Sequence, residues 1–175
     1  MKKYLLSILL LAISVTAFAQ DTTFGIRGGI NISNLDIDPN PTIENSHRNG
    51  YYFGGFVNWR LDDKSALHTE LQFSQEGGKN EALQADYIQV PVMLEFELGH
   101  SLTAGLGGMA SVKTWSFEDG FETFTYSGIA GLEFLINDTL FIEARFNYGL
   151  SNIFDDKSLN EATNTSLQLG IGIKI

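Results

Sequence analysis

The chain has 175 residues with 11 basic and 21 acidic side chains, which gives a formal net charge of −10. This acidic excess excludes nucleic acid as a partner, because binding to a phosphate backbone requires a basic surface. The absence of cysteine excludes disulfides and lipid attachment through a thiol.

The amino-terminal residues have the features of an export signal. Two lysines near the start are followed by an apolar run over 5–15, and Ala17-Phe18-Ala19 has the pattern of a cleavage site. We therefore expect a signal peptide over 1–19, cleavage between Ala19 and Gln20, and one mature domain over 20–175. A membrane anchor is the weaker alternative, because the apolar run is about half the ~20 residues that a spanning helix needs.

The mature chain alternates apolar and polar side chains in eight stretches separated by polar turns or loops. A side-chain period of two indicates a β-strand with different environments on its two faces. In the clearest stretch, every second residue from Ile88 to Leu98 is apolar, whereas Gln89, Glu95 and Glu97 lie between them. In chain order, the pattern predicts strands at 23–32, 50–61, 65–76, 85–98, 102–113, 125–136, 139–150 and 164–175.

The two faces of these strands differ in charge. No acidic or basic residue interrupts the apolar faces, and the opposite faces carry charges of both signs. Buried charges require partners. If the charged faces line the interior of a barrel, we therefore expect a structural ionic network of Arg27, Arg60, Glu70, Glu95, Glu97, Lys113, Glu133, Glu143 and Arg145.

Alternation alone does not decide whether water or lipid touches the apolar face. A soluble lipocalin-like barrel would turn this face inward, whereas an outer-membrane barrel turns it outward. The charged face combines both signs with many glycines, which fits a packed interior better than a solvated surface. Aromatic residues also gather near the ends of the apolar faces, as at a lipid–water interface: Phe24, Tyr51, Trp59, Phe96, Tyr126 and Tyr148.

The connections alternate between long and short, which favours the membrane. Bacterial outer-membrane barrels have short periplasmic turns and long external loops. A strand of about 11 residues at ~3.3 Å each, tilted by ~45°, crosses roughly 26 Å and matches an apolar band of about 25 Å. The long connections are 33–49, 77–84, 114–124 and 151–163, and the short ones are 62–64, 99–101 and 137–138.

These observations predict an all-β fold, an eight-stranded antiparallel up-and-down transmembrane β-barrel in the bacterial outer membrane. Closure follows because lipid offers no hydrogen-bond partners to a free strand edge. Three segments, 25–31, 87–94 and 143–153, resemble strands of the PorT-like outer-membrane β-barrel family. The resemblance implies a small OmpA/OmpX-like barrel of Gram-negative bacteria. One branch of that family is tied to protein secretion, and most members have no assigned activity.

The sequence predicts no catalytic residue, metal site or cofactor. Paired carboxylates can act as acid and base. However, side chains fill the interior of an eight-stranded barrel, which favours a structural network. An envelope hydrolase built on His68 is the least favoured reading, because His68 is expected to point inward and no serine stands out beside it.

The preferred hypothesis is a structural or interaction protein of the cell envelope. Its expected partners are outer-membrane lipid and envelope proteins that contact the acidic loops at 33–49, 77–84, 114–124 and 151–163. A narrow pore or a secretion accessory is the alternative.

Overall fold

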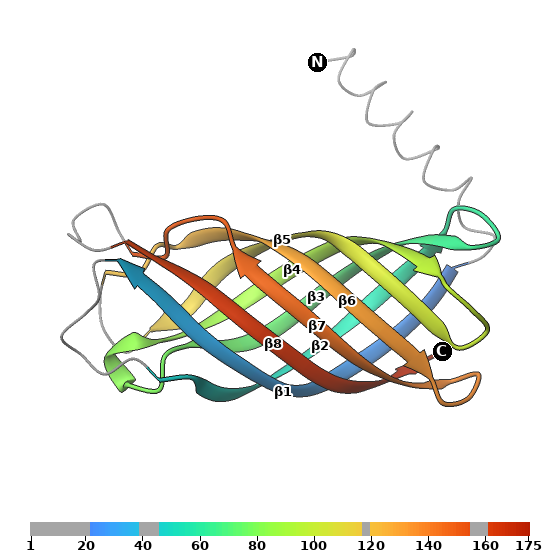
Figure 1. Cartoon of the computed structure of the whole chain (residues 1–175), viewed down its shortest axis with the longest axis horizontal. Helices are drawn as coiled ribbons and strands as arrows, with labels where there is room; N and C mark the ends of the chain where they lie inside the picture. Colours follow the sequence, from blue (N-terminus) through green and yellow to red (C-terminus); the bar gives the residue numbers. More distant parts are fainter. Residues whose placement is uncertain (1–21, 39–45, 117–119, 155–160) are drawn as a thin grey trace, which may run out of the picture.

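The computed structural model describes residues 22–38, 46–116, 120–154 and 161–175. Over these residues the chain forms β-strands and one short 3-10 helix (Figure 1). The elements are β1 (Thr22–Asp38), β2 (Arg48–Arg60), β3 (Ser65–Gly77), η1 (Glu81–Leu83), β4 (Gln84–Glu97), β5 (Leu102–Ser116), β6 (Phe124–Leu135), β7 (Leu140–Gly149) and β8 (Glu161–Lys174). The predicted signal peptide and its cleavage site between Ala19 and Gln20 lie outside the described residues.

The strands close into a barrel, as the alternation predicted. Each strand pairs antiparallel with the next, and β8 pairs with β1 to complete the ring. The closing ladder runs from Gly25 opposite Lys174 to Asp38 opposite Glu161. Closure leaves no strand with an unpaired edge, which is the condition for a sheet surrounded by hydrocarbon. Among the described residues, no helix has the length and hydropathy to cross a membrane.

The two ends of the barrel differ. One end, which we call the turn end, carries the short connections and the strand ends next to both termini (Figure 1, right). Its first turn is held by Asp62, whose carboxylate accepts hydrogen bonds from the backbone N–H groups of Lys64 at 2.8 Å and Ser65 at 2.9 Å. The opposite end, the loop end, carries the long connections.

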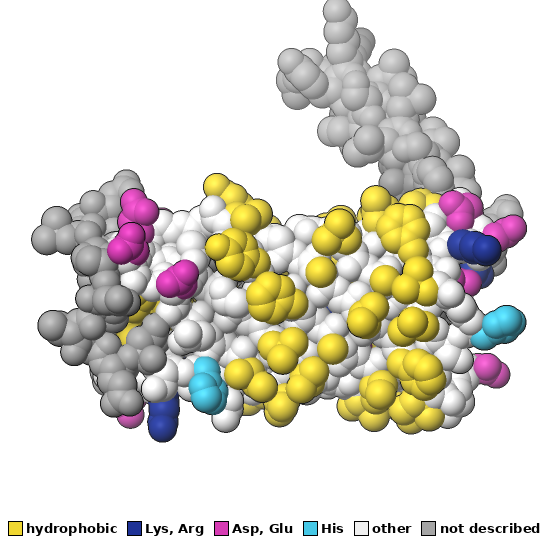
Figure 2. Space-filling view, in the orientation of Figure 1, with side chains coloured by type: hydrophobic (Ala, Val, Ile, Leu, Met, Phe, Trp, Pro, Cys, Tyr) yellow, Lys and Arg dark blue, Asp and Glu magenta, His cyan; other side chains and the backbone are white. Residues whose placement is uncertain are grey.

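The apolar face points outward, as expected for a barrel in lipid. Phe53, Leu71 and Ile171 are more than half exposed. The side chains of Gln72, Gln89 and Gln168 point into the barrel and are fully buried. Hydrophobic side chains form a wide band across the middle of the face shown in Figure 2, and the charged side chains visible there lie beyond the band at the two ends.

The strands continue further at the loop end than the sequence predicted. The residues 33–38 were expected in a loop, but they extend β1. In this extension the inward side chains are apolar and the outward ones acidic, the reverse of the membrane-facing part: Leu35 and Ile37 are buried inside, whereas Asp36 and Asp38 are exposed outside. The predicted start of the last strand at 164 is also late, because β8 begins at Glu161.

Candidate functional site

Four charged side chains from β1, β3 and β7 meet in the middle of the bore. Arg27 Nε lies 2.7 Å from Glu70 Oε1, and Arg145 Nη1 lies 2.8 Å from Glu70 Oε2. Glu143 completes the group by accepting from Arg27 and by lying 3.0 Å from Arg145 Nε. Two guanidinium groups thus face two carboxylates, so the charges balance. We call Arg27, Glu70, Glu143 and Arg145 the central network.

Neutral and titratable side chains extend the central network, and those around His68 lie toward the turn end. His68 Nε2 lies 3.1 Å from Glu70 Oε2, and His68 Nδ1 lies 3.2 Å from Glu95 Oε1. Asn58 donates to Glu95 at 3.0 Å. Tyr52 donates its hydroxyl to Glu143 at 3.0 Å. Sequence reasoning did not include Tyr52, Asn58 or His68 in the network, although their places on the inward side of the alternation were a usable signal.

A second polar layer lies between the central network and the loop end. Glu76 is buried and accepts hydrogen bonds from Gln89 at 2.9 Å and from Ser74 at 3.1 Å. Asn164 on β8 also donates to Glu76 across the bore. Glu76 was missing from the predicted network, yet it follows Glu70, Gln72 and Ser74 on the same inward face of β3. This layer joins β3, β4 and β8.

Four of the predicted network residues lie elsewhere. Arg60 pairs with Glu97 at 2.9 Å, but the two side chains are 44% and 50% exposed at the turn end, so this pair is not interior. Lys113 donates to the backbone carbonyl of Phe121 at 2.7 Å and forms no ion pair within the described part of the chain. Lys113 lies near the loop end of β5. Glu133 pairs with Lys174, which the predicted network did not include.

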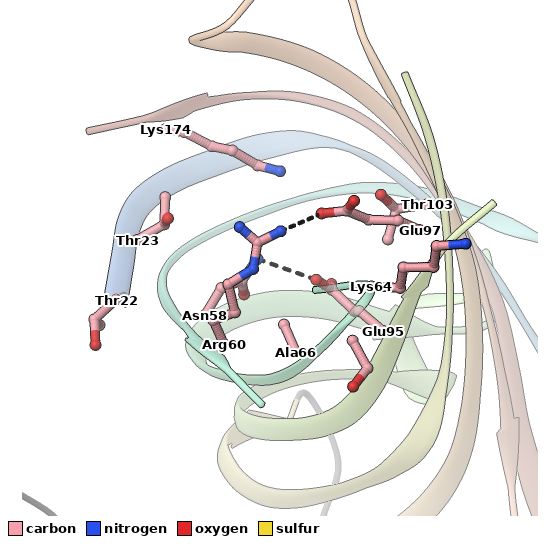
Figure 3. Close-up of a pocket in the computed structure, with 11 residues that line it drawn as sticks. Thr22, Thr23, Asn58, Arg60, Lys64, Ala66, Glu95, Glu97, Thr103 and Lys174 are labelled. Atoms are coloured by element: carbon pink, nitrogen blue, oxygen red, sulfur yellow. Dashed lines mark hydrogen bonds and ion pairs between the residues drawn. The ribbon is translucent and has the colours of Figure 1, made fainter. Parts of the chain in front are cut away.

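The turn end opens into a polar pocket of about 300 Å³ (Figure 3). Side chains of both signs line it, including Arg60, Lys174, Glu95 and Glu97. The Arg60–Glu97 and Asn58–Glu95 bonds cross it, as the dashed lines in Figure 3 show. The pocket therefore extends from the turn end into the bore as far as Asn58 and Glu95, which contact His68.

The serine of this pocket and the histidine near it have different partners. The serine that lines it, Ser65, donates its hydroxyl to Asp62 at 2.6 Å. His68 instead contacts Asn58, Glu70 and Glu95. Ser65 and His68 thus do not form the nucleophile–base pair that a serine hydrolase uses. Within the ranges that the structure describes, no group of three or more His, Asp or Glu residues could hold a metal ion.

An apolar cluster fills the bore at the loop end. Its members come from three strands, from η1 and from two connections: Leu35, Ile37, Leu83, Ala85, Tyr87, Phe121, Ile153 and Ala162. Phe154 packs against this group, and the rings of Phe121 and Phe154 lie 5.4 Å apart. We call these residues the loop-end cluster. It covers the polar layers below it from the loop side.

Comparison with known proteins places these features in context. A family model described as "Outer membrane protein beta-barrel domain" matches residues 5–174. Neisserial surface protein A (NspA) is similar in structure, with a TM-score of 0.58 and 12% identity over 89% of this chain and 100% of that chain. No curated protein matches the chain at a significant level of sequence similarity.

The barrel is also similar to Ail, the attachment invasion locus protein of Yersinia pestis. The TM-score is 0.55 at 16% identity, covering 89% of this chain and 100% of that chain. Ail in complex with the heparin analogue sucrose octasulfate gives a TM-score of 0.54 at 14% identity, with the same coverage. At these identities, the likeness to NspA and Ail concerns the fold.

Proposed function

The chain belongs to the outer membrane protein β-barrel domain family, and from this premise we propose that it is a structural and interaction protein of the cell envelope. Outer-membrane barrels place short turns in the periplasm and long loops outside the cell. The turn end then faces the periplasm, and the loop end presents its connections at the cell surface.

The observation that carries this proposal is the filling of the bore. The central network crosses the middle with buried ion pairs, and the loop-end cluster fills the outer end with apolar side chains. An ion that crossed from the turn-end pocket to the loop end would have to displace both layers. Side chains fill barrels of this size in general. We therefore favour an anchor for surface loops over a solute channel.

The charge of the loops suggests what they bind. The four long connections, 33–49, 77–84, 114–124 and 151–163, contain 10 acidic and 3 basic residues. Such loops attract positively charged surfaces and repel polyanions. We propose that the partner is a basic surface of another envelope protein. A polyanion such as the heparin analogue bound by Ail would meet repulsion here.

Conductance across a planar bilayer tests the filled bore. We expect the purified full-length barrel to produce no stable open steps. Stable steps of sizeable conductance would contradict the proposal and favour the narrow-pore alternative.

Crosslinking in intact envelopes tests the role of the loops. We expect the double variant Asp36→Asn/Asp38→Asn to capture less of a basic partner than the natural chain, because both carboxylates are exposed at the loop end. Asp63→Asn/Asp138→Asn is the matched control, since it removes the same charge from exposed positions in the turns at the turn end. Equal capture by all three chains would contradict recognition by these acidic residues.

A secretion accessory of the PorT-like kind is the second candidate. The turn-end pocket favours it, because this pocket offers charges of both signs to the periplasm. We propose no enzymatic role. Substrate turnover by the purified barrel that His68→Ala abolishes would overturn that inference.

A further inference from the structure

A polar pocket of about 720 Å³ lies at the loop end, apart from the bore and from the turn-end pocket. Residues of β1, of β2 and of the segments that flank η1 form its walls. No acidic residue belongs to this lining: Asn34, Ser46, His47, Arg48, Asn49, Lys79 and Gln84. We call it the basic rim pocket.

The basic rim pocket lies on the outer wall, just beyond the apolar band. Asn34 and Asn49 are both exposed and occupy outward positions of β1 and β2. The next outward residue of β2 toward the membrane is Tyr51, whose side chain is exposed and stacks with Phe53. Tyrosine prefers the boundary between hydrocarbon and headgroups. The pocket therefore sits at the depth of the lipid headgroups.

The charge of the pocket is opposite to that of its surroundings. Only 3 basic residues stand among the long connections, against 10 acidic ones. Two of those three, Arg48 and Lys79, line the basic rim pocket together with His47. Lys79 is exposed, and its ammonium contacts no carboxylate within the described ranges. Asp86 offsets the charge of Arg48, so Lys79 supplies the positive charge that this pocket offers on an acidic end.

Backbone hydrogen bonds fix the segments that carry these bases. Lys79 donates its N–H to the carbonyl of Ser46 at 2.8 Å, and its own carbonyl accepts from Gln84 at 3.2 Å. His47 pairs with Gly78 as a β-bridge. Arg48 Nη1 donates to the carbonyl of Glu76 at 2.7 Å and lies 3.2 Å from Asp86. These contacts fix the backbone that carries Lys79 and the guanidinium of Arg48, which lowers the entropy cost of binding an anion.

We propose that the basic rim pocket binds the phosphate group of a lipid headgroup in the leaflet at the loop end. Lysine and arginine are common phosphate binders, and basic pockets at membrane depth bind anionic headgroups. A soluble polyanion approaching from outside would first meet the acidic loops. A lipid instead enters the pocket from the side, within the plane of the bilayer, and carries its phosphate at the required depth.

Native mass spectrometry of the full-length barrel tests this proposal. The barrel is released from phosphatidylcholine nanodiscs that contain a small fraction of lipid A or phosphatidic acid. We expect the phosphate-monoester lipids to be retained in preference to phosphatidylcholine. Lys79→Gln should lower this retention about fivefold, the effect of one basic residue near a charged membrane surface.

The matched control is Lys64→Gln, which removes the same charge from an exposed site at the turn end. It should leave retention unchanged, and heat-modified gel migration should show that both variants fold. Equal loss in the two variants, or no preference for the phosphate-monoester lipids, would overturn the proposal. Inorganic phosphate at millimolar concentration should not displace the lipid, and full displacement would assign the pocket to free phosphate instead.

Discussion

Arg27 on β1 and Glu70 on β3 meet inside the barrel with 2.7 Å between Nε and Oε1, and neither side chain is exposed. The pair spans β2, which lies between the two strands. Arg145 on β7 reaches the same carboxylate from the opposite wall at 2.8 Å. Glu70 therefore ties together three strands that are far apart in the sequence.

Removing one partner of this group should destabilise the barrel strongly. In Arg27→Met, Glu70 and Glu143 share the single guanidinium of Arg145, and breaking a buried ion pair costs about 3–5 kcal/mol. Arg60→Met is the matched control, because the Arg60–Glu97 pair is half-exposed and such pairs contribute about 0–1 kcal/mol. Denaturant unfolding in lipid vesicles measures both. Similar small losses in the two variants would mean that the central network is not needed for stability.

Gly29 allows β1 and β8 to approach closely. A Cβ at this position would lie 2.1 Å from the carbonyl oxygen of Leu169 and 2.6 Å from the Cα of Gly170, both backbone atoms. We expect Gly29→Ala to lower the free energy of unfolding by about 1–3 kcal/mol, as overpacking does. Gly108→Ala is the control, since its Cβ would have only one neighbour within 4 Å, the Ser127 carbonyl oxygen at 3.7 Å. Unfolding at the same denaturant concentration in both variants would contradict this steric account.

The loss of folding free energy caused by a charge on the outer face should depend on the depth of that charge in the membrane. Val92 lies within the apolar band, whereas Leu98 adjoins the turn at 99–101. An arginine on the lipid face costs about 2–4 kcal/mol at the bilayer midplane and about 0–1 kcal/mol near the interface. We therefore expect Val92→Arg to destabilise the barrel much more than Leu98→Arg, measured by folding into vesicles. Equal tolerance of the two charges would mean that water, not lipid, surrounds this face.

The first turn should respond to acid through Asp62. The hydroxyl of Ser65 and the N–H of Lys64 donate to this carboxylate and hold its pKa below the ordinary value of 3.8. Because the folded-state pKa is lowered, the stabilisation is present above the unfolded-state pKa and is lost as pH falls through the folded value. Carbon NMR titration of the Asp62 carboxyl checks the direction. Ser65→Ala should raise the pKa toward 3.8, and an unchanged titration would exclude the hydroxyl as the main cause.

The faces of the strands were predictable because lipid imposes a strict pattern. Between Ile88 and Leu98, hydrocarbon touches every second side chain, so each outward position is apolar. This part of the prediction needs only the period of a strand and the nature of the solvent. The inward position of Glu70, Glu143 and Arg145 follows from the same period, and the structure places all three inside.

The loop end was not predictable in the same way. Beyond the bilayer, water touches the outer face and packed side chains fill the bore, so the apolar residues move to the inward positions. Leu35 and Ile37 therefore looked like part of a loop, although they continue β1 into the loop-end cluster. When apolar residues are expected only on the lipid-facing side, a switch of the apolar residues to the other side of a strand is mistaken for the end of that strand.

The pairing of the charges depended on closure of the barrel. Arg27 finds Glu70 and Glu143 at separations of 43 and 116 residues. Whether such distant residues meet depends on the register of every pair of strands between β1 and β7. The alternation did not distinguish Lys113, which faces a backbone carbonyl near the loop end, from Arg145, which enters the central network.

The sequence by itself determined that this protein is a barrel with an apolar outer wall and a charged inner face, because a period of two and the environment on each face act locally along every strand. Only the tertiary structure decided which charges meet, where the bore is filled, and that positive charge gathers outside one acidic end. Those properties arise from side chains of distant strands. Their relative positions along the barrel axis are set by the register of all the strand pairs together.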